Sequence, residues 1–223
     1  MEVVTLKGVK KNYVLGKTEV HALRGLNLVV NQGDICILKG HSGSGKSTTL
    51  NIIGGMDLPT SGEVHIAGND IGQLNDYQLS MMRRKHIGFI FQSFNLVPVL
   101  NALENVAYPL HLQKARHSKQ RAKEALIRVG LEKFLHHRPN ELSGGQIQRV
   151  AIARGIVAQP DIILADEPTA NLDSKTSLQI LELMLELNQE QGLTFIISTH
   201  HQMMMESATK TVELVDGEVS YMN

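Results

Sequence analysis

A glycine-rich stretch near the N-terminus has the residue types and spacing needed to hold a phosphate chain. It reads Gly40-His41-Ser42-Gly43-Ser44-Gly45-Lys46-Ser47, which fits the pattern G-x-x-x-x-G-K-[ST]. Glycines let the backbone curve around an anion with its N–H groups pointing inward, and the helix that follows adds its positive dipole end. We expect these residues and Thr48 to bind a nucleotide, with Lys46 on the β- and γ-phosphates and Ser47 on Mg²⁺.

Two carboxylates form a second group that could do chemistry. Asp166 and Glu167 follow the apolar run Ile162-Ile163-Leu164-Ala165. Ligands of open parallel sheets bind at the carboxyl ends of the strands, which is where this run would deliver both acids. We expect Asp166 to hold Mg²⁺ through water and Glu167 to polarise the water that attacks the phosphate.

These groups need strands that end beside them. The apolar run from Asp34 to Lys39 predicts a strand directly before the glycine-rich loop, and a helix is expected after it, stopped by Gly54-Gly55. Apolar runs at 161–165 and 193–198 predict two more strands, with an amphipathic helix between them. Strands that alternate with helices in this way predict an α/β fold with a largely parallel central sheet.

The rest of the chain differs in character from this core. Residues 1–30 alternate between apolar and polar and are punctuated by glycines, which predicts short antiparallel strands. Residues from about 100 to 141 follow a helical pattern. We therefore expect one domain over residues 1–223, with a nucleotide-binding core at 1–89 and 158–223 and an inserted helical subdomain at 90–157.

Composition limits the class of protein. The 223 residues include 22 Lys+Arg and 22 Asp+Glu, and the balanced charge gives no support for nucleic-acid binding. Cys36 is the only cysteine, so an internal disulfide is excluded and a reducing compartment is favoured. No secretory leader and no apolar run of membrane-spanning length is expected. If the protein serves a membrane, a partner must provide the span.

A third motif, Leu142-Ser143-Gly144-Gly145-Gln146, has the form of a capped helix start and offers a second anion site. With the two groups above, it resembles the signature of the ATP-binding-cassette (ABC) ATPases, and the resemblance covers essentially the whole chain. The resemblance implies a P-loop NTPase fold of ABC type, with an antiparallel β-subdomain added to the parallel core sheet. It also implies ATP and Mg²⁺ as ligands, and an ATP-dependent head-to-tail dimer in which Ser143, Gly144, Gly145 and Gln146 contact the nucleotide held by the other subunit.

Four further positions match the family in order. Tyr13 matches the aromatic residue that stacks on adenine, and Gln92 matches the glutamine that senses Mg²⁺ and the attacking water. Asp173 matches the aspartate at the dimer interface, and His200 matches the histidine on the γ-phosphate. Glu167, His200 and Gln92 are therefore the expected catalytic residues, and Ser47, Gln92 and Asp166 the expected Mg²⁺ site. The chain departs from the pattern at His201, where most relatives carry Asp.

Three sequence segments indicate a subgroup within the ABC ATPases. They are Asn51–Asp57, Ile87–Leu96 and Ala102–Val106, and they are similar to the lipoprotein-release and macrolide-export ATPases. That resemblance implies a motor at the cytoplasmic face of the inner membrane. Its partners would be a separate permease with a large extracytoplasmic domain and a periplasmic adaptor. We expect no permease to be fused to the chain.

The motifs also separate this chain from other ABC classes. ABC ATPases of translation carry two cassettes, whereas one phosphate loop is present here. Chromosome and repair ATPases insert long heptad repeats or cysteine modules between the nucleotide motifs, and neither pattern occurs here. A regulator without turnover would be expected to lose Glu167 or His200. A cell-division motor that controls wall hydrolases is the closest alternative.

Overall fold

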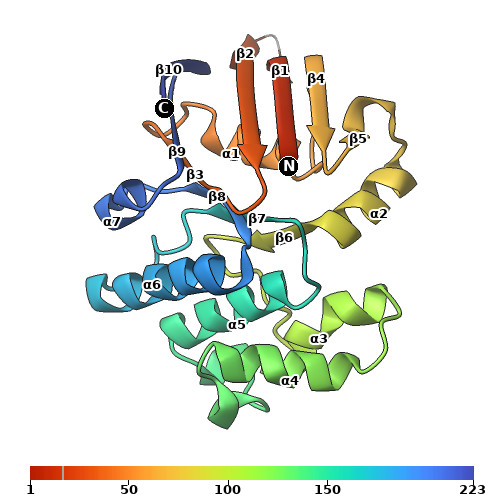
Figure 1. Ribbon diagram of the computed structural model, residues 1–223, viewed down its shortest axis with the longest axis vertical. Coiled ribbons are helices and arrows are strands. Elements are labelled where there is room, and N and C mark those ends of the chain that lie inside the picture. The colour runs from red at the N-terminus through yellow and green to blue at the C-terminus, as the bar shows by residue number, and fades with distance from the viewer. Residues whose placement is uncertain (17) are drawn as a thin grey trace.

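The computed structural model of the protein describes residues 1–16 and 18–223, and two β-sheets frame it (Figure 1). The larger sheet has the strand order β10-β9-β3-β8-β7-β6. Its strands are β3 (Ile35–Lys39), β6 (Ile87–Ile90), β7 (Ile162–Asp166), β8 (Thr194–Ser198), β9 (Lys210–Val215) and β10 (Glu218–Met222). All neighbours pair in parallel except β10, which runs antiparallel to β9. The predicted parallel core sheet is confirmed.

The second sheet is antiparallel and has the order β2-β1-β4-β5. Its strands are β1 (Glu2–Leu15), β2 (Thr18–Asn31), β4 (Ser61–Ile66) and β5 (Asn69–Asp70). The prediction of short strands here was wrong, since β1 and β2 each have 14 residues. Gly8 and Gly25 have positive φ and lie where the register shifts, so they make bulges inside two long strands instead of ending short ones.

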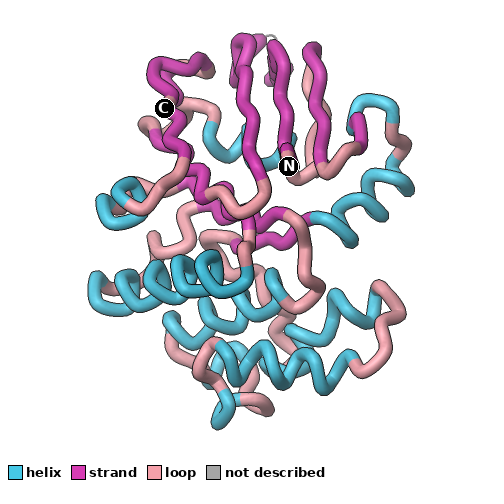
Figure 2. The backbone as a smooth tube through the Cα atoms, viewed as in Figure 1, coloured by secondary structure: helices cyan, strands magenta, loops and turns pink. Residues whose placement is uncertain are grey.

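Most helices lie on one side of the parallel sheet (Figure 2). The α-helices are α1 (Lys46–Ile53), α2 (Asp76–His86), α3 (Ala102–Leu112), α4 (Ser118–Arg128), α5 (Gly144–Ile156), α6 (Ser174–Gln191) and α7 (Gln202–Glu206). Single 3₁₀ turns are η1 (Ile71–Gln73), η2 (Glu132–Phe134) and η3 (Pro139–Glu141). Three helices, α3 to α5, gather at the end opposite the antiparallel sheet, within the predicted helical segment 90–157. The boundaries of that subdomain stay a prediction.

The parallel sheet separates two apolar cores. Alternate residues of β3 point to opposite faces, so that Ile37 packs with the helical side and Cys36 and Leu38 pack toward α1 and the antiparallel sheet. Burial raises the pKa of the Cys36 thiol to about 12, so the side chain behaves as a small apolar residue. Because both faces are covered, the carboxyl edge of the sheet remains to carry polar side chains.

Candidate active site

A cleft of about 760 Å³ opens where the carboxyl ends of the parallel strands meet the antiparallel sheet. It brings together most of the residues predicted to bind or hydrolyse a nucleotide. Those residues are Ser42, Gly43, Gly45, Lys46, Ser47, Thr48, Gln92, Asp166, Glu167 and His200. The rest of its lining was not predicted and comes from β2 and the turn after β9, namely Glu19, Val20, His21, Ala22, Arg24 and Asp216.

The glycine-rich loop is shaped to leave room for an anion. Gly40, Gly43 and Gly45 have φ values of 146°, 80° and 106°, which favour glycine. A Cβ on Gly45 would lie 2.7 Å from the Ala22 carbonyl oxygen, so the loop packs directly on β2. The first residues of α1, Lys46, Ser47 and Thr48, line the cleft, and their backbone N–H groups have no partner within the helix. This cradle fits a phosphate chain.

Lys46 places its ammonium group inside the loop. Its Nζ donates to the carbonyl oxygens of Gly40, at 2.5 Å, and His41, at 3.1 Å. The residue is only 8% exposed, and it lines the cleft. A buried cation beside the helix N-terminus makes this end of the cleft strongly attractive to a polyphosphate.

The carboxylate of Asp166 and the backbone of Glu167 are held by a residue that sequence reasoning missed. Ser198, at the end of β8, donates from Oγ to Asp166 Oδ1 at 2.5 Å, and the Glu167 backbone N–H donates to the same Oγ at 2.9 Å. Ser198 pairs in register with Asp166 across β7 and β8. That pairing is the signal that could have found it, had the order of the strands been known.

Glu167 and His200 face each other across the cleft. His200 Nε2 lies 3.7 Å from Glu167 Oε1, and both side chains are partly exposed. Glu167 has a φ of 46°, an uncommon value for a residue with a side chain, and such backbone strain clusters at functional sites. The strand end therefore aims Glu167 into the cleft, where it can orient a water molecule.

Gln92 joins the cleft to another loop. Its side chain contributes to the cleft lining, while its backbone carbonyl accepts from Asn171 Nδ2 at 2.9 Å. Asn171 precedes Asp173 and the start of α6. This hydrogen bond ties the Gln92 backbone to the segment that carries Asp173.

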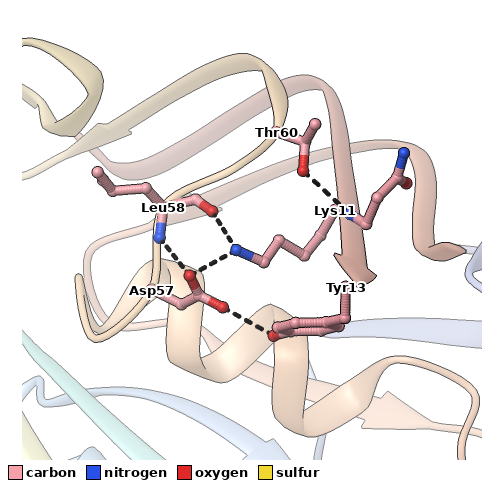
Figure 3. Close-up of polar contacts among 6 residues, drawn as sticks. Lys11, Tyr13, Asp57, Leu58 and Thr60 are labelled. Carbon is pink, nitrogen blue, oxygen red and sulfur yellow. Dashed lines mark hydrogen bonds and ion pairs between the residues drawn. The ribbon is translucent and has the colours of Figure 1, made fainter. Parts of the chain in front are cut away.

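Four residues of the predicted nucleotide site do not line the cleft: Tyr13, Gly40, His41 and Ser44. Gly40 and His41 instead supply the carbonyls that hold Lys46. The hydroxyl of Tyr13 donates to Asp57 Oδ2 at 2.8 Å (Figure 3). Its cross-strand partner Val20, on β2, does line the cleft. Tyr13 therefore lies on the strand next to the one that lines the cleft. Its predicted contact with adenine stays a prediction.

The residues predicted to act across a dimer form a separate group at two helix starts. Ser143 caps α5, with its Oγ 3.4 Å from the Gln146 backbone nitrogen and its own N–H donating to Gln146 Oε1 at 2.8 Å. A Cβ on Gly145 would lie 2.5 Å from Thr176 Cγ2, so the starts of α5 and α6 are packed together. Ser143, Gly144, Gly145, Gln146 and Asp173 are all outside the cleft, and none of them is buried.

Asp173 is held as an anion at the start of α6. Its Oδ2 accepts from the Thr176 hydroxyl at 2.6 Å, and its Oδ1 accepts from the Thr176 backbone N–H at 3.0 Å. These hydrogen bonds, the hydroxyl's first, hold the pKa of the Asp173 carboxyl below its usual value. The side chain is therefore charged at neutral pH and faces solvent.

Comparison with known proteins agrees with this geometry. The sequence profile of the ABC transporter family matches residues 23–170. An uncharacterized ABC transporter ATP-binding protein from Thermotoga maritima is 49% identical over 220 residues, which cover 98% of this chain and 94% of that protein. The chain belongs to the ABC transporter family. It is an ATP-binding and ATP-hydrolysing subunit of that family.

Other members show how far the similarity extends. The lipoprotein-releasing system ATP-binding protein LolD of Alcanivorax borkumensis is 46% identical over 217 residues, covering 96% of this chain and 95% of that protein. The macrolide export ATP-binding/permease protein MacB of Bdellovibrio bacteriovorus is 43% identical over 216 residues. These cover 97% of this chain but 33% of that protein.

A solved structure confirms the predicted ABC fold. It is a dimer of the ATP-binding cassette MJ0796 in a post-hydrolysis state, bound to ADP and phosphate. The TM-score is 0.91 at 46% identity, and the match covers 99% of this chain and 97% of that one. Over the described residues, none of the helices in this ABC subunit has the length and apolar character required to cross a bilayer.

Proposed function

We propose that this ABC ATPase works as a head-to-tail dimer that binds Mg²⁺ and ATP at its interfaces and drives a separate membrane permease. The observation that carries the proposal is the division of the predicted ATP contacts into two groups. The cleft holds the phosphate loop and the acids, while the Ser143 helix start lies outside it and is exposed. A second copy, turned head to tail, would bring its own Ser143 group over the open cleft.

The residues of the cleft divide the chemistry between them. Lys46 and the N–H groups of the loop neutralise the β- and γ-phosphates. Bound Mg²⁺, held through Ser47, Gln92 and Asp166, would supply a Lewis acid for the same phosphates. Glu167 orients the attacking water, and His200 stabilises charge on the γ-phosphate. Most of the catalysis is positioning and electrostatics, which suits a site fixed by strand ends.

A groove on the helical side supports a permease partner. It has a volume of about 390 Å³ and lies between β6, α2, α3 and α5. Met56, Tyr108 and Leu112 contribute apolar surface to it and are 47%, 46% and 45% exposed. Arg83 and Arg84 add positive charge. An amphipathic segment of a permease with acidic residues would fit such a surface.

The groove also connects to the ATP cleft. Phe91 lines the groove, and the next residue, Gln92, lines the cleft. The guanidinium of Arg154, whose pKa burial lowers, donates to the Phe94 and Asn95 carbonyls and so braces this segment. A change in the position of Gln92 on loss of the γ-phosphate would thus move Phe91 and alter the groove to which the permease binds.

The relatives named for lipoprotein release and macrolide export support the finer assignment. The permease would carry a large extracytoplasmic domain, with a periplasmic adaptor in some systems, and the motor would sit at the cytoplasmic face of the inner membrane. A cell-division motor acting on wall hydrolases uses the same arrangement and is the main alternative. A non-transport ABC ATPase is the second.

The experiment is a co-purification with Glu167→Gln, which should bind ATP without hydrolysing it and so hold the dimer closed. Tagged Glu167→Gln is extracted from native membranes in mild detergent with ATP and Mg²⁺, and its partners are identified by mass spectrometry. A permease with a large external domain is expected, together with an ATP-dependent dimer in gel filtration. Capture of a ribosome, a repair complex or no membrane protein would remove the transport assignment, and a monomer at every ATP concentration would remove the dimer.

A further inference from the structure

A charged cluster outside the cleft holds the side chain of Tyr13. Asp57 Oδ2 accepts from the Tyr13 hydroxyl at 2.8 Å, and Asp57 Oδ1 accepts from Lys11 Nζ at 2.6 Å (Figure 3). Lys11 Nζ also donates to the Leu58 carbonyl at 2.9 Å and lies 4.9 Å from the centre of the Tyr13 ring. Lys11 and Tyr13 both come from β1, whereas Asp57 comes from the loop after α1.

The cluster is well enough shielded to be specific. The side chain of Lys11 is 13% exposed and that of Asp57 is 29% exposed, and the Leu58 backbone N–H adds a third hydrogen bond to Asp57 at 2.8 Å. By contrast, the neighbouring pair of Lys7 and Glu63 is 64% and 62% exposed at 3.7 Å. Charge-assisted hydrogen bonds in a shielded site are stronger and more directional than surface ion pairs.

The loop that carries Asp57 is tied at both ends. The Met56 backbone N–H donates to Asn51 in α1 at 2.9 Å, and the Thr60 N–H donates to Lys10 in β1 at 2.8 Å. Because α1 begins at Lys46, the cluster connects the ring of Tyr13 to the same helix that presents the phosphate loop.

Protonation matches these roles. Burial first, and then the hydrogen bond to Asp57, raise the pKa of the Tyr13 hydroxyl, so it remains a donor at neutral pH. Burial would raise the pKa of Asp57, but the hydrogen bonds from Lys11 and Tyr13 outweigh it and the pKa lies below its usual value. The Tyr13 hydroxyl is therefore a donor and the Asp57 carboxylate an acceptor near pH 7.

We propose that Lys11 and Asp57 are positioning residues that hold the Tyr13 ring at a fixed place relative to the phosphate loop, so that it can receive the base of the nucleotide. The inference rests on the proposed function and on the predicted role of Tyr13. The ring is anchored at both ends, by its Cβ on β1 and by its hydroxyl on Asp57. Val20, its cross-strand partner, already lines the cleft. Stacking depends on ring placement, so a loosened anchor weakens recognition of the base but not of the phosphates.

The test compares ATP with inorganic tripolyphosphate, which has the phosphates but no base. Calorimetry should show ATP binding weakened about 10- to 100-fold in Tyr13→Ala, and about five- to tenfold in Asp57→Asn and Lys11→Met. Binding of tripolyphosphate should stay within about twofold of the original chain, since the phosphate loop is untouched. In steady-state hydrolysis, Asp57→Asn should raise KM for ATP with kcat unchanged.

A matched control removes a carboxylate that contacts a different lysine of β1. Glu63→Gln breaks the exposed contact to Lys7 and should change the binding of neither ATP nor tripolyphosphate. In a double-mutant cycle, Tyr13→Phe should cost little once Asp57→Asn is present, because the hydroxyl has then lost its charged acceptor.

Two results would overturn the inference. Equal weakening of ATP and tripolyphosphate in both Asp57→Asn and Lys11→Met would mean that the cluster only supports the fold. Unchanged ATP binding in both, with Tyr13→Ala impaired, would mean that the anchor does not control the ring. Failure of the unaltered chain to bind ATP would instead refute the proposed function.

Discussion

Two helices, α1 and α5, begin at glycine-rich segments, and the surroundings of the two helix starts differ. The start of α1 lies in a cleft, beside a buried lysine and opposite two carboxylates. The start of α5 is exposed and closed by its own Ser143–Gln146 capping box. The same device, a helix N-terminus, is therefore surrounded by other charged groups of the chain in one place and left open in the other.

The glycines differ in the same sense. In the phosphate loop, Gly40, Gly43 and Gly45 have positive φ, so the backbone itself is bent to enclose a ligand. Gly144 and Gly145 do not have positive φ, and Gly145 is needed because Thr176 lies where its Cβ would be. Close packing is common to both sets, since a Cβ on Gly45 would meet the Ala22 carbonyl oxygen, but only the first set also needs a backbone conformation that favours glycine.

The largest effect should come from the complete site. Lys46→Ala removes the buried ammonium. We expect ATP hydrolysis to fall by about 100-fold or more, since one fixed donor to a developing charge is worth that much. ATP affinity should fall as well, because the ammonium also attracts the bound phosphates. Calorimetry with ATP and phosphate release measure the two quantities. Lys7→Ala removes an exposed lysine and should leave both unchanged. Unaltered ATP binding in Lys46→Ala would contradict the assignment of the cleft.

The exposed surface should respond differently. Ser143→Ala removes the cap of α5, and we expect hydrolysis to fall about tenfold or more while ATP binding to the single subunit is unchanged. Asn101→Ala is the matched control, because Asn101 caps α3 with the same kind of box, through Glu104. Each variant should lose about 1 kcal/mol of stability, but only Ser143→Ala should lose hydrolysis. Equal hydrolysis by Ser143→Ala and Asn101→Ala would mean that Ser143 acts only as a helix cap and does not contact ATP.

Features of the fold and site could be predicted from the sequence where the residues that form them are close together along the chain. The phosphate loop, the strand before it and α1 are consecutive in sequence, so their order and composition sufficed. The fold class and the parallel sheet followed from alternating apolar runs. The two long strands β1 and β2 did not, because a glycine at a bulge and a glycine at a turn look alike in the sequence.

The parts of the site that were missed all depend on lateral neighbours. Ser198 holds Asp166 because β8 lies next to β7, and the residues of β2 line the cleft because Ala22 packs on Gly45. Tyr13 was predicted for adenine, but its anchor on Asp57 is 44 residues away in sequence. Periodicity fixes which face a side chain occupies, but not which strand lies beside it.

The smallest effect concerns Asp173, which lies on the exposed surface beside Ser143. Its pKa is lowered in the folded state, so the stabilisation it gives is present above the usual value of 3.8 and is lost as the pH falls through the lowered value. Asp173→Ala should therefore lower the melting temperature slightly at pH 7, and the difference should vanish as the pH drops well below 3.8. Asp173→Asn keeps an acceptor for the Thr176 N–H without a titrating group, so its stability relative to Asp173→Ala should not change over the same range. If the destabilisation by Asp173→Ala instead grew larger in acid, the charged form of Asp173 would be unfavourable at this helix start, and the capping role would be refuted.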